Sequence, residues 1–235
     1  MNLIDRMYKA FGLSYHMELS TRPKNSTGTD EMWKNAEDAL EDALEEMKVE
    51  YKLNPGDGAF YGPKIDFHIK DAIGRTWQCG TIQLDFSMPE RFELSYIGED
   101  GKEHRPVMLH RVIYGAVERF MGILIEHFAG AFPTWLSPVQ VMILPVSEKF
   151  KDYARQVETH CNTSLLRVET DDSDESLGKR IRAAKLQKVP YILVVGEKES
   201  TSDSVAVNSR DNDKQEVMKV EEFLEKIKKK IDEKK

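Results

Sequence analysis

The sequence is poor in cysteine, in long apolar runs and in net positive charge, and each shortage excludes a class of protein. Its 235 residues contain two cysteines, Cys79 and Cys161, which lie far apart and form no CxxC pair, so a disulfide framework is not expected. No apolar run reaches the roughly 18 residues of a membrane-spanning helix. The first residues are charged and lack the apolar core of a secretory signal. These shortages predict a cytoplasmic protein with no membrane segment.

Charge is unevenly distributed, although the total is only −7. Residues 1–137 hold 15 basic and 22 acidic side chains, whereas residues 138–235 hold 19 of each. An RNA or DNA partner therefore cannot be inferred from the overall charge. It would have to bind a local basic patch.

The first half of the sequence opens with helical and then strand-like spacing. A helix is predicted from Asp30 to about Lys48, with Thr27 and Asp30 as a capping box at its start. The segment from Tyr51 to Leu109 then alternates apolar with polar side chains, as a half-buried strand does. Short connections between these strands favour an antiparallel sheet.

Two strands and one helix of this half can be bounded more closely. Strands are expected at 76–86 and 92–97. A long amphipathic helix follows, and it is expected to pack on the sheet. Its apolar residues, at helical spacing, are Ile113, Val117, Phe120, Met121, Leu124, Ile125 and Phe128.

The second half alternates strands with helices after a domain boundary near Ser137. Apolar strands are predicted at 139–144, 165–168, 191–195 and 205–207. Helices are predicted at 148–161 and 177–188, and a last helix places Val220, Phe223, Ile227 and Ile231 on one stripe. This alternation indicates a small α/β domain with helices on both faces of its sheet.

Polar residues near the middle of the first half are not explained by core packing. Lys64 follows a glycine-containing turn, where a lysine can neutralise a phosphate, although a surface lysine beside a hairpin is an equally simple explanation. On an ideal strand Thr81, Gln83 and Asp85 face one way and Gln78 the other. Such a face forms either a hydrogen-bonding floor for a ligand or a solvated strand surface.

Further polar residues lie where the last strand of the first half gives way to its long helix. Arg119 flanks the apolar stripe, and a phosphate is a suitable partner for it. Ala116 is small enough for a ligand or the sheet to approach closely. His110 could ligate a metal, but a lone histidine is more often structural.

A cluster of basic residues occupies the helix predicted at 177–188. Five cations, Lys179, Arg180, Arg182, Lys185 and Lys188, lie within ten residues. A basic helix face can contact an RNA backbone, or it can simply be solvated.

Taken together, six stretches resemble the threonyl-tRNA synthetase family of class II aminoacyl-tRNA synthetases. They are LSTRP, GAFYGPKIDF, QCGTIQLDF, YIGEDG, PVMLHRVIYGAVERFMGILIEHFAGAFPTWLSPVQ and VPYILVVGEKE. They occur in family order, and ERFMGILIE looks like motif 3 of class II enzymes. The resemblance covers nearly the whole chain.

The resemblance implies an α/β (α+β) fold. Residues 1–137 would be a partial class II catalytic domain, an antiparallel sheet flanked by helices, and residues 138–235 a small α/β anticodon-binding domain. Its implied activity is that of a threonine–tRNA ligase, which forms threonyl-adenylate from threonine and ATP and passes the threonyl group to tRNA. The implied cofactors are ATP, Mg²⁺ and Zn²⁺, and family members are homodimers.

The resemblance also implies site residues. The catalytic residues would be Arg119, Gln78 and Lys64, with Arg119 on the ATP phosphates. The residues around threonine would be Tyr61, Thr81, Gln83 and Ala116, and His110 would be one of three zinc ligands. The residues contacting tRNA would be Lys179, Arg180, Arg182, Glu199 and Arg210.

Departures from the family pattern limit these expectations. Motifs 1 and 2 and the other two zinc ligands would precede Met1, so the chain is expected to be a carboxy-terminal fragment, inactive without a complementing upstream segment. Asn208 stands where the family commonly has an anticodon-reading arginine, and Asp174 replaces a typical asparagine. The alternative is a non-catalytic tRNA-binding module.

Overall fold

The computed structural model describes residues 1–234. These residues fall into two compact units, 1–127 and 128–234. Both units combine helices with a five-stranded sheet, which confirms the predicted mixed α/β fold class. Among the described residues, no helix is both long enough and apolar enough to cross a membrane.

The first unit is built on a sheet with strand order β2-β1-β3-β4-β7. Its elements are α1 (Asn2–Ala10), β1 (Tyr15–Ser20), α2 (Asp30–Glu46), β2 (Tyr51–Asn54), β3 (Lys64–Lys70), β4 (Thr76–Asp85), α3 (Ser87–Arg91), β5 (Tyr96–Ile97), β6 (Glu103–His104), β7 (Met108–Val112) and α4 (Val117–His127). Three of its strand pairs are antiparallel, as predicted. The pair β1–β2 is parallel because α2 carries the chain back between them.

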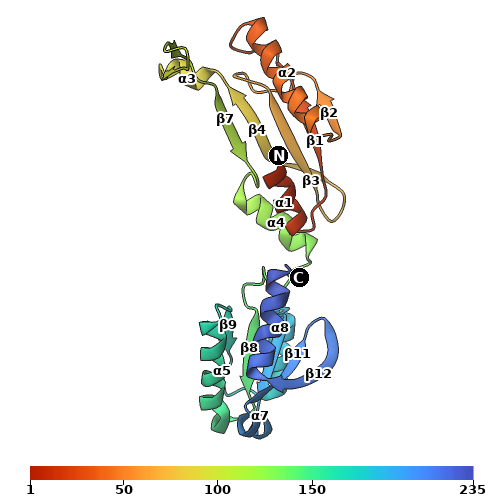
Figure 1. Ribbon diagram of the computed structural model, residues 1–235. Helices are drawn as coiled ribbons and strands as arrows, with labels where there is room; N and C mark the ends of the chain where they lie inside the picture. The colour runs from red at the N-terminus through yellow and green to blue at the C-terminus, as the bar shows by residue number, and fades with distance from the viewer. Residues whose placement is uncertain (235) are drawn as a thin grey trace. The chain divides into compact units, whose positions relative to one another are not determined.

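One face of this sheet is apolar and carries the helices. Met17 and Leu19 from β1 and Ile65, Phe67 and Ile69 from β3 are all buried. Figure 1 shows α1 and α2 against the sheet and α4 beside α1 at its lower end. Because successive residues of a strand point to opposite faces, the intervening polar residues gather on the other face.

The helix α2 begins at Asp30 as predicted, but its N-cap lies two residues later than predicted. Thr29, rather than Thr27, is the N-cap, and its hydroxyl accepts a hydrogen bond from the Met32 amide at 3.2 Å. The Thr27 amide and hydroxyl both donate to the Phe60 carbonyl, so Thr27 holds the loop before α2 and does not cap the helix. The predicted capping box at Thr27 and Asp30 was therefore wrong.

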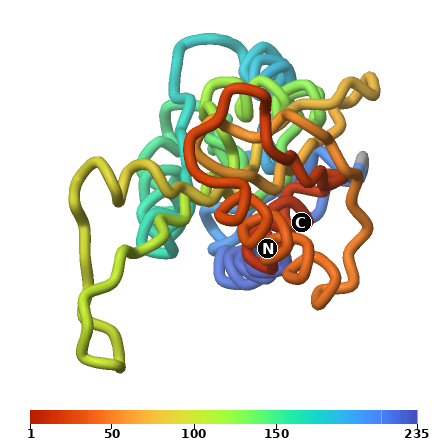
Figure 2. Tube along the Cα trace, turned by 90° about the horizontal axis from the view of Figure 1, so that it is seen from above, coloured from red at the N-terminus to blue at the C-terminus, as the bar shows by residue number. Residues whose placement is uncertain are grey.

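The segment predicted as a strand at 92–97 is mostly turn and hairpin. Glu93 has φ of 50°, which ends α3 and prevents an extended strand there. The strand is confined to Tyr96–Ile97 and pairs only with β6. Figure 2 shows this β5–β6 hairpin, in yellow-green, reaching away from the sheet.

The helix α4 is shorter than its apolar spacing predicted. It starts at Val117 because Gly115, with φ of 65°, holds a turn after β7, and Ile113 lies outside the helix. Phe120 and Leu124 are buried as expected. Met121 and Ile125 were predicted to pack on the sheet, but they are exposed on the other side of α4.

The second unit has strand order β12-β11-β10-β8-β9, with helices on both faces as predicted. Its elements are β8 (Val141–Pro145), η1 (Glu148–Phe150), α5 (Lys151–Thr163), β9 (Val168–Thr170), α6 (Leu177–Leu186), β10 (Tyr191–Val195), α7 (Glu197–Ser202), β11 (Ser204–Ser209), β12 (Asn212–Lys219) and α8 (Val220–Asp232). Strands β9, β8 and β10 are parallel, and β11 and β12 are antiparallel additions.

Alternate side chains of β8 pack into two separate hydrophobic cores. Val141 and Ile143 pack with residues of α5 and α8, whereas Met142 and Leu144 pack with Ala184 of α6. The strand predicted at 165–168 starts only at Val168, because Leu165 has φ of 59° in the turn after α5. The antiparallel strand β12 was not predicted.

Candidate functional site

A β-bulge in β4 assembles the polar face of the first sheet. His68 of β3 pairs with Gln78, but Phe67 pairs with Gly80, so Cys79 is the extra residue. The bulge resets the alternation of side chains and brings Gln78 to the same face as Thr81 and Gln83. The sequence prediction placed Gln78 on the face opposite Thr81 and Gln83. That prediction was wrong because it assumed a regular strand without the bulge.

Asp66 of β3 is the centre of this polar face. Its buried carboxylate accepts hydrogen bonds from Ser20 and Thr81, each at 2.9 Å, and from Gln78 and Lys64. Three strands are thereby joined through one side chain. The sequence prediction missed Asp66, although its position between Lys64 and His68 in an alternating strand placed it on this face.

Lys64 is held by acidic partners on both sides. Besides Asp66, its ammonium contacts the exposed Asp57 carboxylate at 3.3 Å. This arrangement fixes the lysine at the edge of the polar face. Its charge is already balanced there, so Lys64 is better suited to orient its neighbours than to attract a phosphate alone.

Tyr61, Gln83 and His110 meet at the β7 edge of the face. Gln83 and His110 are directly opposite each other in the β4–β7 pair. The Tyr61 hydroxyl donates to Gln83 Oε1 at 3.1 Å, and the Tyr61 ring packs edge-on against the His110 ring. The structure thus brings together three residues that the sequence predicted as one site.

His110 is oriented by a buried carboxylate. Its Nε2 lies 2.8 Å from Asp85 Oδ2, and the side chains of His110 and Asp85 are 45% and 2% exposed. Burial acts to raise the pKa of Asp85, but the hydrogen bonds from His110 and from the Met88 and Ser87 amides bring it below its ordinary value. An ionised Asp85 holds the Nε2–H tautomer of His110, which leaves Nδ1 as the ring acceptor.

The donors around His110 bear on the zinc site that the resemblance implies. Asp85 is already committed to His110 Nε2 and to two backbone amides. Among the described residues, one group of three histidine, cysteine or acidic side chains is close enough to share a metal ion. His110 is not a member of that group. The described residues therefore supply one donor, His110, to a three-ligand zinc site and do not complete it.

Arg119 lies at the other end of the polar face. It comes from the first turn of α4, and its Nη2 donates to the Gln78 carbonyl at 2.7 Å. Gly115 permits this approach, because a Cβ there would lie 3.0 Å from both Arg119 Nη2 and the Cys79 carbonyl. Ala116, between them, is exposed. The remaining guanidinium donors of Arg119 are available to an anionic ligand.

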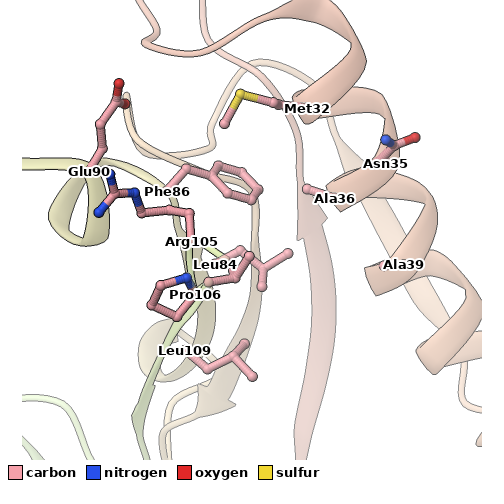
Figure 3. A pocket seen from close by; sticks show the side chains of 11 residues that line it. Met32, Asn35, Ala36, Ala39, Leu84, Phe86, Glu90, Arg105, Pro106 and Leu109 are labelled. Carbon is pink, nitrogen blue, oxygen red and sulfur yellow. The ribbon is translucent and has the colours of Figure 1, made fainter. Parts of the chain in front are cut away.

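A cavity of about 690 Å³ lies on the opposite face of the same two strands. Figure 3 shows Met32 and Ala36 of α2 across from Leu84 and Leu109 of β4 and β7. Leu84 and Leu109 are the next neighbours of Gln83 and His110, and their side chains alternate to this side. This apolar cavity is therefore distinct from the polar face.

The basic helix of the second unit is less uniform than its sequence predicted. Lys179 and Arg182 are exposed, and Lys179 pairs with Glu175 at 2.7 Å. Arg180 is only 6% exposed, and its guanidinium donates to the carbonyls of Pro145, Asp171 and Glu175. Arg180 was predicted to contact RNA, but its side chain is enclosed by backbone carbonyls and does not contribute to the basic face.

Arg210 and Glu199 are also bound by the unit itself. Arg210 donates to the Lys188 carbonyl at 2.9 Å and to Asp211, yet it borders a cavity of about 240 Å³ together with Lys185 and Asn208. Glu199 accepts from the Gly196 amide at 3.0 Å and caps α7. Lys185, Asn208 and Arg210 therefore offer one polar concave surface, whereas Glu199 lies at a helix start.

Two family models match the chain. A model described as the tRNA synthetase class II core domain (G, H, P, S and T) matches residues 1–128. A model described as an anticodon binding domain matches residues 140–230.

Curated relatives carry the name threonine–tRNA ligase. The chain is 60% identical over 231 residues to the protein of Caldanaerobacter subterraneus subsp. tengcongensis and 58% identical over 231 residues to that of Clostridioides difficile. Each match covers 98% of this chain and 36% of the relative. The chain thus spans about a third of the length of these relatives.

Solved structures are similar over nearly all of the chain. One described as the RNA binding domain of threonyl-tRNA synthetase from Cryptosporidium parvum Iowa II has a TM-score of 0.91 and 42% identity, covering 97% of this chain and 58% of that one. A second, described as a threonyl-tRNA synthetase from Aeropyrum pernix, has a TM-score of 0.71 at 23% identity, covering 99% of this chain and 60% of that one, and supports the fold alone.

Proposed function

The chain belongs to the class II tRNA synthetases through residues 1–128, more than half of its length, and on that premise we propose that it acts as part of a threonine–tRNA ligase. The reaction joins threonine to ATP as threonyl-adenylate, releases pyrophosphate, and passes the threonyl group to tRNA. Threonine, ATP with Mg²⁺ and tRNA are accordingly the proposed ligands. The identity of about 60% to proteins of that name supports the choice among class II enzymes.

One observation carries the proposal for the first unit: Arg119 and the Asp66 network meet at Gln78. The Gln78 carbonyl accepts from Arg119, while the Gln78 side chain donates to Asp66 and Thr81. A guanidinium fixed in this way can bind phosphate oxygens without further ordering of the site. The Gln78 end of the face is thus assigned to the ATP phosphates.

The other end of the face is assigned to threonine. Tyr61, Gln83 and His110 are in mutual contact there, and Thr81 lies between them and Gln78 on β4. A site that hydrogen-bonds a substrate hydroxyl discriminates strongly against a substrate that lacks it. We assign Tyr61, Thr81 and Gln83 to hold threonine, with Ala116 leaving room beside Arg119, and we route no step through a metal at His110.

Nucleotide binding by the chain tests the assignment of Arg119. Replacing Arg119 by alanine should weaken binding of a fluorescent ATP analogue by about 10–100-fold, the effect of losing a charge-assisted hydrogen bond of about 1.5–3 kcal/mol. Arg111 is the matched control, because it is exposed on the neighbouring strand β7 but alternates away from His110. Equal effects of the two substitutions would refute the assignment.

A second experiment tests the reaction. Threonine-dependent ATP–pyrophosphate exchange should be absent from the chain alone and should appear when the unmatched part of a close relative is supplied as a separate polypeptide. The incomplete donor set around His110 is the reason for expecting no exchange by the chain alone. Exchange by the chain alone, or valine-dependent exchange at the same rate in the mixture, would contradict the proposal.

The alternative, a tRNA-binding module without catalysis, is favoured by the second unit alone. Lys179, Arg182 and Lys185 lie exposed on α6, and Lys185 borders a cavity together with Arg210. Charge reversal of Lys179 and Arg182 should weaken a tRNA gel shift and flatten its salt dependence. A chain that binds tRNA but neither ATP nor threonine, even in the mixture, would support this alternative.

A further inference from the structure

Two histidines and a glutamate form a cluster on the polar face of β1 and β3. His16 lies directly opposite His68 in this antiparallel pair, and Glu18 follows two residues later on the same face. His16 Nε2 is 3.0 Å from Glu18 Oε1, and His68 Nε2 is 3.6 Å from Glu18 Oε2. Possible ligand atoms of all three side chains lie within 4.8 Å of one another.

These distances match the requirements of a small metal ion. Zinc binds imidazole nitrogen and carboxylate oxygen at about 2.0–2.2 Å, so neighbouring ligand atoms of a tetrahedral site lie about 3.3–3.5 Å apart. The two separations given above, 3.0 and 3.6 Å, bracket that value. The imidazole rings are stacked, with centroids 5.0 Å apart and an interplanar angle of 15°, so side-chain rotation is needed to direct both nitrogens at one ion.

The surroundings keep the three side chains in place. Their exposed fractions are 26% for His16, 19% for Glu18 and 20% for His68. Asn54 Nδ2 donates to Glu18 Oε2 at 3.2 Å and orients the carboxylate.

A fourth coordination position would be reachable from solvent. His16 lines a cavity of about 360 Å³, and Lys52 and Lys70 line it as well. A water molecule can enter such a cavity, and the two lysines favour an anionic fourth ligand.

The cluster is separate from His110. Strands β3 and β4 lie between β1 and β7, and a spacing of about 4.8 Å between neighbouring strands places the two histidine positions roughly 14 Å apart. A single ion cannot bind to both. His68 pairs with Gln78, whose carbonyl accepts from Arg119, so the cluster borders the Gln78 end of the polar face without sharing a residue with it.

We propose that His16, Glu18 and His68 bind one divalent transition-metal ion, with zinc the best match to a His₂Glu donor set that leaves one position open. The ion joins β1 to β3 at the end of the polar face. This site does not depend on the proposed ligase activity, because its residues lie outside those assigned to threonine and ATP.

Cobalt(II) is the probe for this proposal, since it reports its coordination in the visible spectrum and zinc displaces it. The full chain, treated with a chelator, is titrated with cobalt(II) and then with zinc. One equivalent should bind, and X-ray absorption should show two imidazole ligands. Binding of several equivalents, or an ion without imidazole ligands, would overturn the proposal.

Substitutions locate the ion. His16→Asn and His68→Asn should each weaken binding by more than the roughly 10–100-fold that loss of an outer partner costs. Glu18→Gln retains the size of the side chain and should weaken binding as well, and circular dichroism confirms that each variant is folded. The controls are His110→Asn and His104→Asn, because each removes a histidine–aspartate pair elsewhere. Loss of the ion in a control variant alone would place it at that histidine and refute the site.

Discussion

Replacing Arg180 by methionine separates structural stability from RNA contact. The substitution keeps the apolar stem of the side chain but removes the donors to three backbone carbonyls, at distances of 2.7–3.1 Å. The carbonyl of Pro145 is buried and would lose its partner at about 1–3 kcal/mol. The carbonyls of Asp171 and Glu175 are part-buried and can regain water, at about 0.5–1.5 kcal/mol each. The free energy of unfolding of the second unit should therefore fall by about 2–6 kcal/mol.

Hydrogen exchange read by mass spectrometry measures this change, because peptides from β8 and β10 report the second unit separately from the first. Arg182→Met is the matched control, because Arg182 is exposed on the same helix. The free energy of unfolding of the second unit should change by less than about 0.5 kcal/mol in this variant. Under conditions in which both variants are folded, Arg182→Met should reduce tRNA affinity more than Arg180→Met. Unchanged exchange in the Arg180 variant, or the reverse order of tRNA affinities, would refute the assignment of Arg180 to the interior.

Three further predictions concern other buried groups. Asp66→Ala should lower the free energy of unfolding of the first unit by about 3–5 kcal/mol, because Lys64 and three other donors lose a buried carboxylate; Asp57→Ala removes the other, exposed partner and should change it by less than about 1 kcal/mol in urea denaturation. Since the pKa of Asp85 is lowered in the folded state, its stabilisation is present above its ordinary value of 3.8 and is lost as the pH falls below it. His110→Ala should therefore flatten the fall of the urea midpoint between about pH 5 and about pH 3, and an unchanged slope would contradict the pairing. Burial raises the pKa of Cys161 to about 12, so its thiol should react with Ellman's reagent only after unfolding, and rapid reaction of the native chain would disprove its burial.

Much of the fold could be predicted because hydrophobic spacing is a strong local signal. The stripe of Val220, Phe223 and Ile227 on α8 is buried as predicted. The alternation around Asp66 and the apolar strand Tyr191–Val195 also placed β3 and β10 correctly. In each case the side-chain period of a single element decides the result, and no distant contact competes with it.

The failures arose where contacts distant in sequence decide the structure. Thr27 has the right spacing for a helix cap but bonds to Phe60, 33 residues away. Arg180 has the same helical environment as Lys179, and only the fold brings the Pro145 carbonyl to it. Met121 belongs to an apolar stripe that is wider than the surface against which α4 packs.

The candidate site shows the same division. The family resemblance named Tyr61, Gln83, His110 and Arg119, and the structure brings the first three into contact. Asp66 was not assigned a role from the sequence, and Asp85 was placed only on a possible ligand-binding face, not as the partner of His110. Their importance depends on burial and on the number of donors around them, and neither quantity can be counted along a chain.

The extra residue at Cys79 constrains how this gene can change in length. Successive side chains of a strand point to opposite faces of the sheet. Deleting one codon at Cys79 would remove the bulge, so every side chain of β4 on one side of the deletion would move to the opposite face. Gln78 would turn toward the helices, or Thr81 and Gln83 would. An insertion or deletion at this position would therefore disrupt the polar face in a single step.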